Sequence, residues 1–123
     1  MFDAEATLHG LFPHMHFRGK SFTYEAHYPD GRVDTILSTP NYSFNWQRSY
    51  MLAEPLLLPA GTKIVCHAVF DNSARNKFNP DPTRNVTWGD QSFDEMLIGY
   101  MTVTQARRPG VSASVMSELA AAR

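Results

Sequence analysis

Three residues near the start of the chain carry its most specific chemical signal. The sequence His14-Met15-His16 places two imidazoles two residues apart. In a β-strand, residues i and i+2 project from the same face, so both rings would converge on one point. Imidazole is a common ligand of zinc and copper. The spacing therefore favours two ligands of a metal site.

Such a site needs a third ligand, and three residues are candidates. His67 lies in a later strand segment, while Glu95 and Met96 lie at the start of the last one. Two histidines with Glu95 would suit zinc, whereas two histidines with Met96 would select copper, because a soft thioether favours Cu(I). Alternation puts Glu95 and Met96 on opposite faces of an extended chain, so at most one faces the histidines. The spacing alone leaves the third ligand open.

The residues around these candidates have expected roles as well. Asp94 or Glu95 could orient one of the histidines through the ring N–H that a metal leaves free. Arg18 and Lys20 follow the histidines and are expected at a solvated strand end.

Length and charge describe the domain that must position these residues. The chain has 123 residues, 43% of them hydrophobic and 19% charged, and a formal net charge of −1. This predicts one domain over residues 1–106, followed by a tail or weak C-terminal helix over residues 107–123. Because there is no basic excess, we expect no nucleic-acid partner. No apolar run reaches the length of a membrane span, so we expect none.

Period-2 patterns dominate the sequence and predict an all-β protein. Residues 21–28 alternate between apolar and polar side chains, and the turn Pro29-Asp30-Gly31-Arg32 leads into a second extended segment. These two segments predict a hairpin. Further strands are expected at residues 44–51, 62–70 and 94–105, the last of them in the core.

Proline- and glycine-rich segments separate these strands. The prolines predict a connection over residues 54–61, and residues 71–90 predict a long surface loop. Strands at this spacing favour an antiparallel sandwich or barrel. Cys66 is the single cysteine, so no internal disulfide can form, and its strand pattern places it on the inward face.

Three segments, in order, resemble a known family. They are HMHFRGK at residues 14–20, CHAVFD at residues 66–71 and WGDQSFDEMLIGYM at residues 88–101. Together they resemble the C-terminal domain of the copper type II, ascorbate-dependent monooxygenases. This is the family of peptidylglycine α-hydroxylating monooxygenase and dopamine β-monooxygenase, and the chain looks most like its bacterial branch. The resemblance covers about residues 5–106.

The resemblance implies a site, a fold and a function. His14, His16 and Met96 would be the ligands of one copper ion that activates dioxygen. The fold would be an antiparallel β-sandwich of jelly-roll type. The chain would be the oxygen-activating domain of a larger monooxygenase that hydroxylates a C–H bond of a small-molecule or peptide substrate, with ascorbate or another reductant supplying electrons. An extracytoplasmic location, periplasmic or secreted, is also implied.

The chain departs from the peptide-amidating members in ways that bear on the substrate. Those members have an arginine two residues before the first ligand histidine and an asparagine two residues after the methionine, where this chain has Phe12 and Ile98. They also have a disulfide-forming cysteine where this chain has Leu97. Tyr100 matches the family. We therefore expect Phe12, Ile98 and Tyr100 to line a pocket for an apolar or aromatic substrate.

The family's second copper, which transfers electrons, is held by three histidines in an N-terminal domain. His9, His27 and His67 match no such pattern. We therefore expect an N-terminal copper domain or a redox partner outside this chain, and an isolated chain that is inactive. A non-catalytic copper-binding or docking module on a β-sandwich scaffold is the alternative, because the same ligands would serve both.

Overall fold

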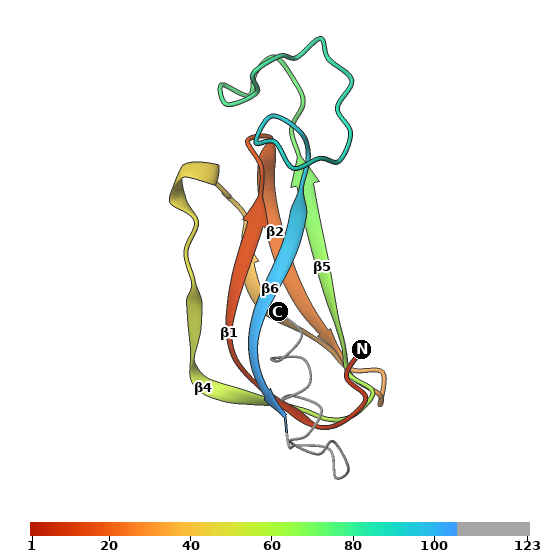
Figure 1. Cartoon of the computed structure of the whole chain (residues 1–123). Coiled ribbons are helices and arrows are strands. Elements are labelled where there is room, and N and C mark those ends of the chain that lie inside the picture. The colour runs from red at the N-terminus through yellow and green to blue at the C-terminus, as the bar shows by residue number, and fades with distance from the viewer. Residues whose placement is uncertain (106–123) are drawn as a thin grey trace, which may run out of the picture.

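Six strands form two antiparallel sheets in the computed structural model, which describes residues 1–105. The first sheet has the order β4-β1-β6 and the second the order β3-β2-β5 (Figure 1). The strands are β1 (Ala6–Met15), β2 (Gly19–His27), β3 (Val33–Thr39), β4 (Tyr50–Leu58), β5 (Lys63–Phe70) and β6 (Leu97–Gln105). The predicted all-β, antiparallel class is confirmed. The tail or helix predicted at residues 107–123 lies outside the described residues.

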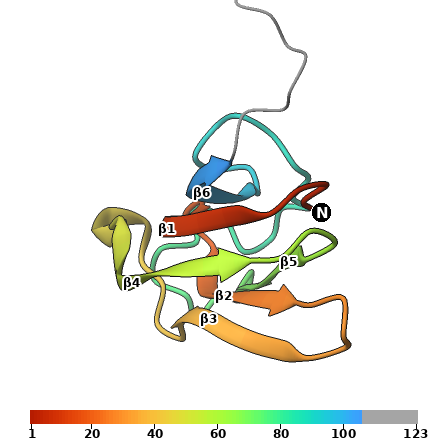
Figure 2. The same ribbon diagram turned by 90° about the horizontal axis from the view of Figure 1, so that it is seen from below.

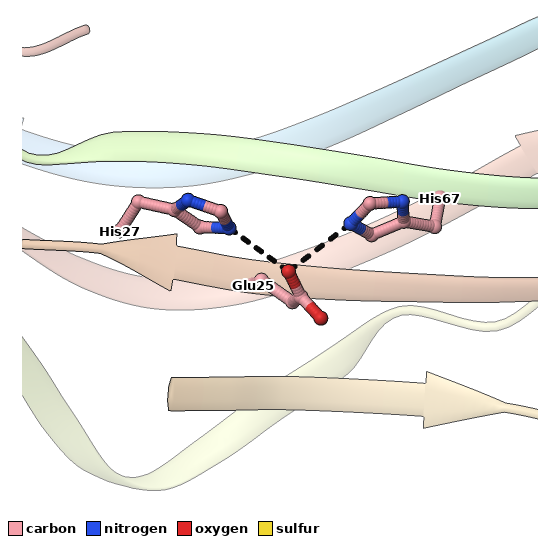
Figure 3. Close-up of side chains that lie close together, drawn as sticks. All are labelled: Glu25, His27 and His67. Carbon is pink, nitrogen blue, oxygen red and sulfur yellow. Dashed lines mark hydrogen bonds and ion pairs between the residues drawn. The ribbon is translucent and has the colours of Figure 1, made fainter. Parts of the chain in front are cut away.

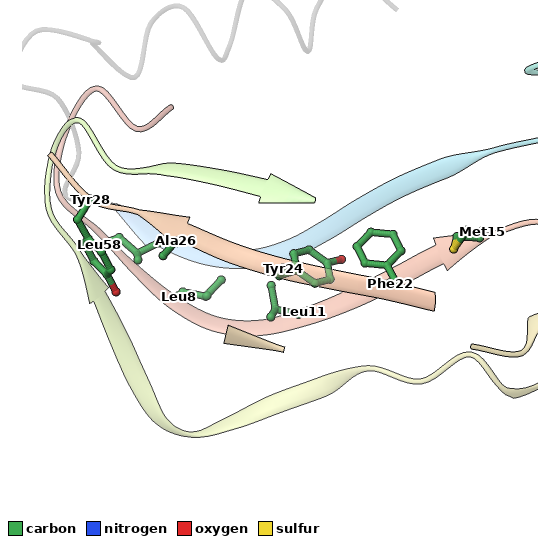
Figure 4. Close-up of a cluster of buried hydrophobic side chains, with 8 residues drawn as sticks. All are labelled: Leu8, Leu11, Met15, Phe22, Tyr24, Ala26, Tyr28 and Leu58. Carbon is green, nitrogen blue, oxygen red and sulfur yellow. The ribbon is translucent and has the colours of Figure 1, made fainter. Parts of the chain in front are cut away.

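The hydrophobic core lies between the two sheets. Seen from below, β1 and β6 lie on one side of the molecule and β2 and β3 on the other (Figure 2). The alternation predicted for residues 21–28 is confirmed, because its apolar members all point inward. The fully or nearly buried cluster consists of Leu8, Leu11, Met15, Phe22, Tyr24, Ala26, Tyr28 and Leu58 (Figure 4).

The hairpin between β2 and β3 forms as predicted. Tyr28 donates its backbone N–H to the carbonyl of Arg32 at 2.8 Å, which closes the turn. Gly31 sits in this turn with φ of +87°, a conformation that glycine adopts without a steric penalty. Turn chemistry at this position therefore identified the hairpin correctly.

Cys66 on β5 faces the core, as predicted from its strand pattern. It packs against the buried cluster, and burial raises the pKa of its thiol. A Cβ on Gly99 of β6 would come within 2.5 Å of the Cys66 sulfur. Glycine at this position therefore allows β6 to approach β5 of the other sheet closely.

The strand predicted at residues 44–51 and the connection predicted at residues 54–61 are wrong. Residues Phe44–Trp46 form a short 3-10 turn, and β4 runs from Tyr50 through Pro55 to Leu58. The register with β1 shifts between Leu8 and Gly10, where residues 52–55 of β4 bulge out. Proline is tolerated there because β4 is an edge strand with an irregular ladder.

The last strand also differs from its prediction. It begins at Leu97 rather than at residue 94, and its residues 100–105 are exposed. Because β6 pairs only with β1, it lies at the edge of its sheet rather than in the core. The long loop predicted at residues 71–90 is confirmed, and it continues to residue 96.

One end of the molecule gathers the segments that carry the candidate ligands. β1 ends there, the corner at residues 16–18 crosses to β2, and the loop of residues 71–96 arches over both before β6 begins (Figure 1). His16 and Gly19 close the corner through a backbone hydrogen bond of 2.9 Å. Within residues 1–105, no helix has the length and apolar character needed to cross a membrane.

Candidate metal centre

His14 and His16 lie side by side at the end of β1. Their ring centroids are 5.2 Å apart and the ring planes are perpendicular. His16 is only 5% exposed, whereas His14 is half-buried. The i, i+2 spacing thus brings the two imidazoles together, although His16 lies one residue beyond the end of the strand.

Met96 lies one residue before β6 and is bonded through its backbone to His16, which lies one residue after β1. His14 pairs with Ile98, Met15 pairs with Leu97, and the N–H of His16 donates to the carbonyl of Met96 at 3.4 Å. Directly opposed residues of an antiparallel pair place their side chains on the same face. The register therefore aligns Met96 with His16, next to His14 and Ile98.

The other two candidates for the third ligand have different partners. Glu95 accepts a hydrogen bond from the side-chain amide of Asn72 at 2.8 Å. His67 belongs to β5 in the other sheet. Of the three candidates, Met96 is the one whose backbone bonds a histidine of the pair, His16.

The protonation pattern of His14 follows from its contact with Gln47. The side-chain N–H₂ of Gln47 donates to the carbonyl of Phe44 at 2.9 Å, so its Oε1 faces Nδ1 of His14 at 2.7 Å. An amide oxygen only accepts, so neutral His14 must carry its proton on Nδ1. Its Nε2 then holds a free lone pair.

His16 is oriented in the same way by the loop that precedes β6. Its Nδ1 lies 3.3 Å from the backbone carbonyl of Asp94, which can only accept a hydrogen bond. Neutral His16 therefore also keeps Nε2 unprotonated. Metal-binding histidines are commonly oriented by such a bond from the other ring nitrogen. The contact predicted for Asp94 exists, but it uses the backbone rather than the carboxylate.

Tyr42 supports the strand end between the two histidines, a role that no sequence pattern indicated. Its hydroxyl donates to the carbonyl of Met15 at 2.7 Å and accepts from the N–H of Met15 at 2.8 Å. The pairing of β1 with β4 stops at Leu11. Tyr42 thus takes the place of a β4 partner for Met15. Burial raises the pKa of the Tyr42 hydroxyl.

Arg18 is buried, which contradicts the expected solvated strand end. It is 1% exposed and donates from Nε to the side-chain oxygen of Asn79 at 2.8 Å, and from Nη1 to the carbonyl of Phe93. Both acceptors belong to the loop that leads to Met96. Arg18 therefore anchors this loop to the corner. Lys20 is exposed as expected and pairs with Asp71 at 3.5 Å.

The predicted pocket residues lie on the face that carries His14. The Tyr100 ring is 6.4 Å from the His14 ring and 5.9 Å from the Phe12 ring, between centroids. Ile98 pairs with His14 across the ladder. Phe12 and Tyr100 line a small pocket of about 100 Å³, and Ile98 is not among its lining residues, which are Leu11, Phe12, Ser49, Met51, Tyr100, Met101 and Thr102.

A second group of potential ligands was not predicted from the sequence. Glu25 and His27 of β2 and His67 of β5 lie together on the other sheet (Figure 3). The two imidazoles bond the Glu25 carboxylate and hold its pKa below its usual range. The spacing of Glu25 and His27 was a weak signal, because their partner lies forty residues away in the sequence.

Neither protein-family models nor curated proteins contain a match to this chain. The family resemblance therefore depends on the three sequence segments alone.

Proposed function

We propose that this chain is the oxygen-activating, mononuclear copper domain of a larger reductant-dependent monooxygenase that hydroxylates a C–H bond of its substrate. His14, His16 and Met96 would hold the copper. The observation that carries the proposal is the pair of Nδ1 contacts, to Gln47 Oε1 and to the Asp94 carbonyl. Both leave Nε2 free, and the backbone of His16 is bonded to that of Met96.

The donor set fits copper better than zinc. Two neutral imidazoles and one thioether form a soft set, which favours Cu(I), whereas structural and catalytic zinc sites use thiolate, imidazole and carboxylate ligands. Copper bound here would supply the one-electron redox chemistry that dioxygen activation requires. Three protein ligands would leave a coordination position for dioxygen.

The surrounding residues have distinct tasks in this proposal. Gln47 and the Asp94 carbonyl hold the Nδ1 protons and so keep both rings turned toward the ion. Phe44 covers His16 at 6.2 Å between ring centroids and packs on Phe17 at 4.6 Å, which limits water at this ring. The aromatic cover thus protects the more buried ligand.

The wall beside His14 supports an apolar or aromatic substrate. Phe12, Ile98 and the ring of Tyr100 share the ligand face. A carboxylate placed against such a wall without a cationic partner would lose several kcal/mol of hydration. Discrimination against glycine-extended peptides is therefore part of the proposal.

The remaining parts of the proposal concern the complete protein. Electrons would come from an N-terminal copper domain or from a redox partner outside this chain, with ascorbate or another reductant as their source. An extracytoplasmic location belongs to the same proposal. So does a jelly-roll connectivity, with which two antiparallel sheets around a shared core are compatible.

Titration with Cu(I) against a competing chelator tests the ligand set. The chain should bind one Cu(I), and Met96→Ala should weaken binding on the order of tenfold or more, because two imidazoles remain without the thioether. Met101→Ala, which removes an exposed methionine of β6, is the matched control and should have no effect. An affinity unchanged by Met96→Ala would remove this residue from the site, and a loss only with Glu95→Ala would favour zinc.

Turnover assays on the full-length protein test the reaction. With copper and reductant present, hydroxylation of a neutral aromatic compound should exceed amidation of a glycine-extended peptide. Efficient peptide amidation would contradict the proposed substrate class. Tight copper binding without turnover on either substrate would instead support a non-catalytic copper-binding module.

A further inference from the structure

We infer that Glu25, His27 and His67 form a second metal site, which binds a borderline divalent ion such as Zn²⁺. The site lies on the sheet that does not carry His14 and His16. It is independent of the proposed copper function, since it uses none of the same residues.

The strand register places the three side chains on one face. Glu25 and His27 are two residues apart on β2, so they project from the same side. His67 of β5 pairs with Thr23 of β2, which makes His67 a diagonal neighbour of Glu25. Because the alternate residues Tyr24 and Ala26 point into the core, this face is the outer one. The cluster thus has a rigid backbone frame and an open side.

The donor atoms already lie near a coordination geometry. Oε2 of Glu25 is 2.9 Å from Nε2 of His27 and 3.0 Å from Nε2 of His67, and all three atoms lie within 4.8 Å of one another. Tetrahedral zinc with bonds of roughly 2.0–2.1 Å separates its donors by about 3.3 Å. Movements of a few tenths of an ångström to about 1.5 Å in half-exposed side chains would therefore accommodate the ion.

The ligand types indicate which ion fits. Two imidazoles and one carboxylate are a known zinc ligand set that leaves positions open for water. The set lacks the sulfur that selects Cu(I) and the oxygen cage that Ca²⁺ or Mg²⁺ prefers. The His67 side chain is 59% exposed and that of Glu25 is 25% exposed, so solvent reaches the site and can supply the remaining ligands.

Binding would change the tautomer of both rings. Both Nε2 atoms now bond the same carboxylate oxygen, so each neutral ring carries its single N–H hydrogen there. An ion at the centre would take the Nε2 lone pairs, and the hydrogen of each ring would move through solvent to Nδ1, with no net release of protons. The negative charge of Glu25 would stay in the site and partly neutralise the ion.

Calorimetric titration with Zn²⁺ tests the inference on the full chain. His14→Ala serves as the background, because it removes one imidazole from the other histidine pair. This protein should bind one Zn²⁺. Adding His67→Ala or Glu25→Gln should weaken binding at least about tenfold. His9→Ala is the matched control, because His9 bonds Thr104 on the other sheet. It should leave the affinity unchanged.

Two further measurements separate binding from loss of structure. Zn²⁺ should raise the unfolding temperature of the background protein, and this shift should disappear with His67→Ala, an exposed edge-strand position. Co²⁺ should give the intense visible bands of a tetrahedral site in the background protein, and these bands should be absent when His67→Ala is added. Zinc binding that survives both His67→Ala and Glu25→Gln, or no binding by the background protein, would overturn the inference. Cu(I) affinity of the chain with His67→Ala alone should be unchanged, so this result and the copper proposal fail separately.

Discussion

The two histidine clusters of this protein differ in which ring nitrogen is hydrogen-bonded and in the charge of its partner. At the end of β1, Nδ1 of each imidazole faces an uncharged oxygen and Nε2 is free. On the outer face of β2 and β5, Nε2 itself faces the carboxylate of Glu25. The first pair is oriented for an ion without a charged residue, whereas the second pair brings its own anion. In the two proposals, the same residue type would therefore serve soft and borderline ions, depending on its neighbours.

The two clusters also differ in how they are held. His27, Glu25 and His67 need only the register of two adjacent strands. His14 and His16 need Gln47 after the 3-10 turn, Asp94 in the long loop and the corner after β1. We therefore expect the pair of His14 and His16 to depend on distant residues, and the Glu25 cluster, which consists of Glu25, His27 and His67, to tolerate their loss.

Of the substitutions that test this comparison, Arg18→Met should have the largest effect. It leaves the Asn79 side-chain oxygen and the Phe93 carbonyl without their donor, which should lower the free energy of unfolding by about 2–4 kcal/mol. Chemical denaturation measures this loss, and Cu(I) affinity should fall with it. Arg75→Met, an exposed arginine of the same loop, is the control. Equal effects of the two variants would show that Arg18 does not anchor the loop.

Gln47→Leu should weaken Cu(I) binding by roughly 10–100-fold while leaving the fold intact. The reason is that Nδ1 of His14 loses its acceptor, so the ring is free to rotate or to change tautomer. Chelator competition measures the change, with Gln91→Leu on the exposed loop surface as the control. Zn²⁺ affinity at the Glu25 cluster should not change. A comparable loss at both clusters would contradict their separate support.

Tyr42→Phe should lower the free energy of unfolding by about 1–2 kcal/mol. The backbone N–H and carbonyl of buried Met15 both lose their partner, although the aromatic ring stays in place. Denaturant unfolding gives the value, and Tyr50→Phe on β4 provides the same chemical change nearby. If both variants unfold like the unaltered chain, Tyr42 does not replace a strand partner.

Lys63→Gln should have the smallest effect, a roughly twofold to fivefold gain in Zn²⁺ affinity. Lys63 pairs with His27 across β2 and β5, so its positive charge opposes a cation in the Glu25 cluster. Lys77→Gln in the loop of residues 71–96 is the control for a general change in charge. The gain should shrink as salt is added, because exposed charges are screened. A gain that is independent of salt would point to another cause.

Local patterns in the amino-acid sequence were sufficient for several features. Alternation in residues 21–28 identified the buried face of β2, and Gly31 identified the turn after it. The spacing of His14 and His16 indicated two converging imidazoles. These predictions are correct because strand alternation and turn conformation depend on residues only a few positions apart. The connection predicted around Pro55 was wrong, since an edge strand with a bulge accepts a proline.

Long-range packing set the remaining features, and no local pattern could supply them. The backbone of His16 bonds that of Met96, rather than that of Glu95, just beyond the ladder of β1 and β6. Gln47 approaches His14 across thirty-three positions of the chain, and His67 approaches Glu25 across forty-two. Arg18 is buried because a loop sixty-one residues later folds over it. Each of these contacts depends on how the sheets and loops pack together, because hydrogen bonds and burial between distant segments leave no periodic trace in either segment.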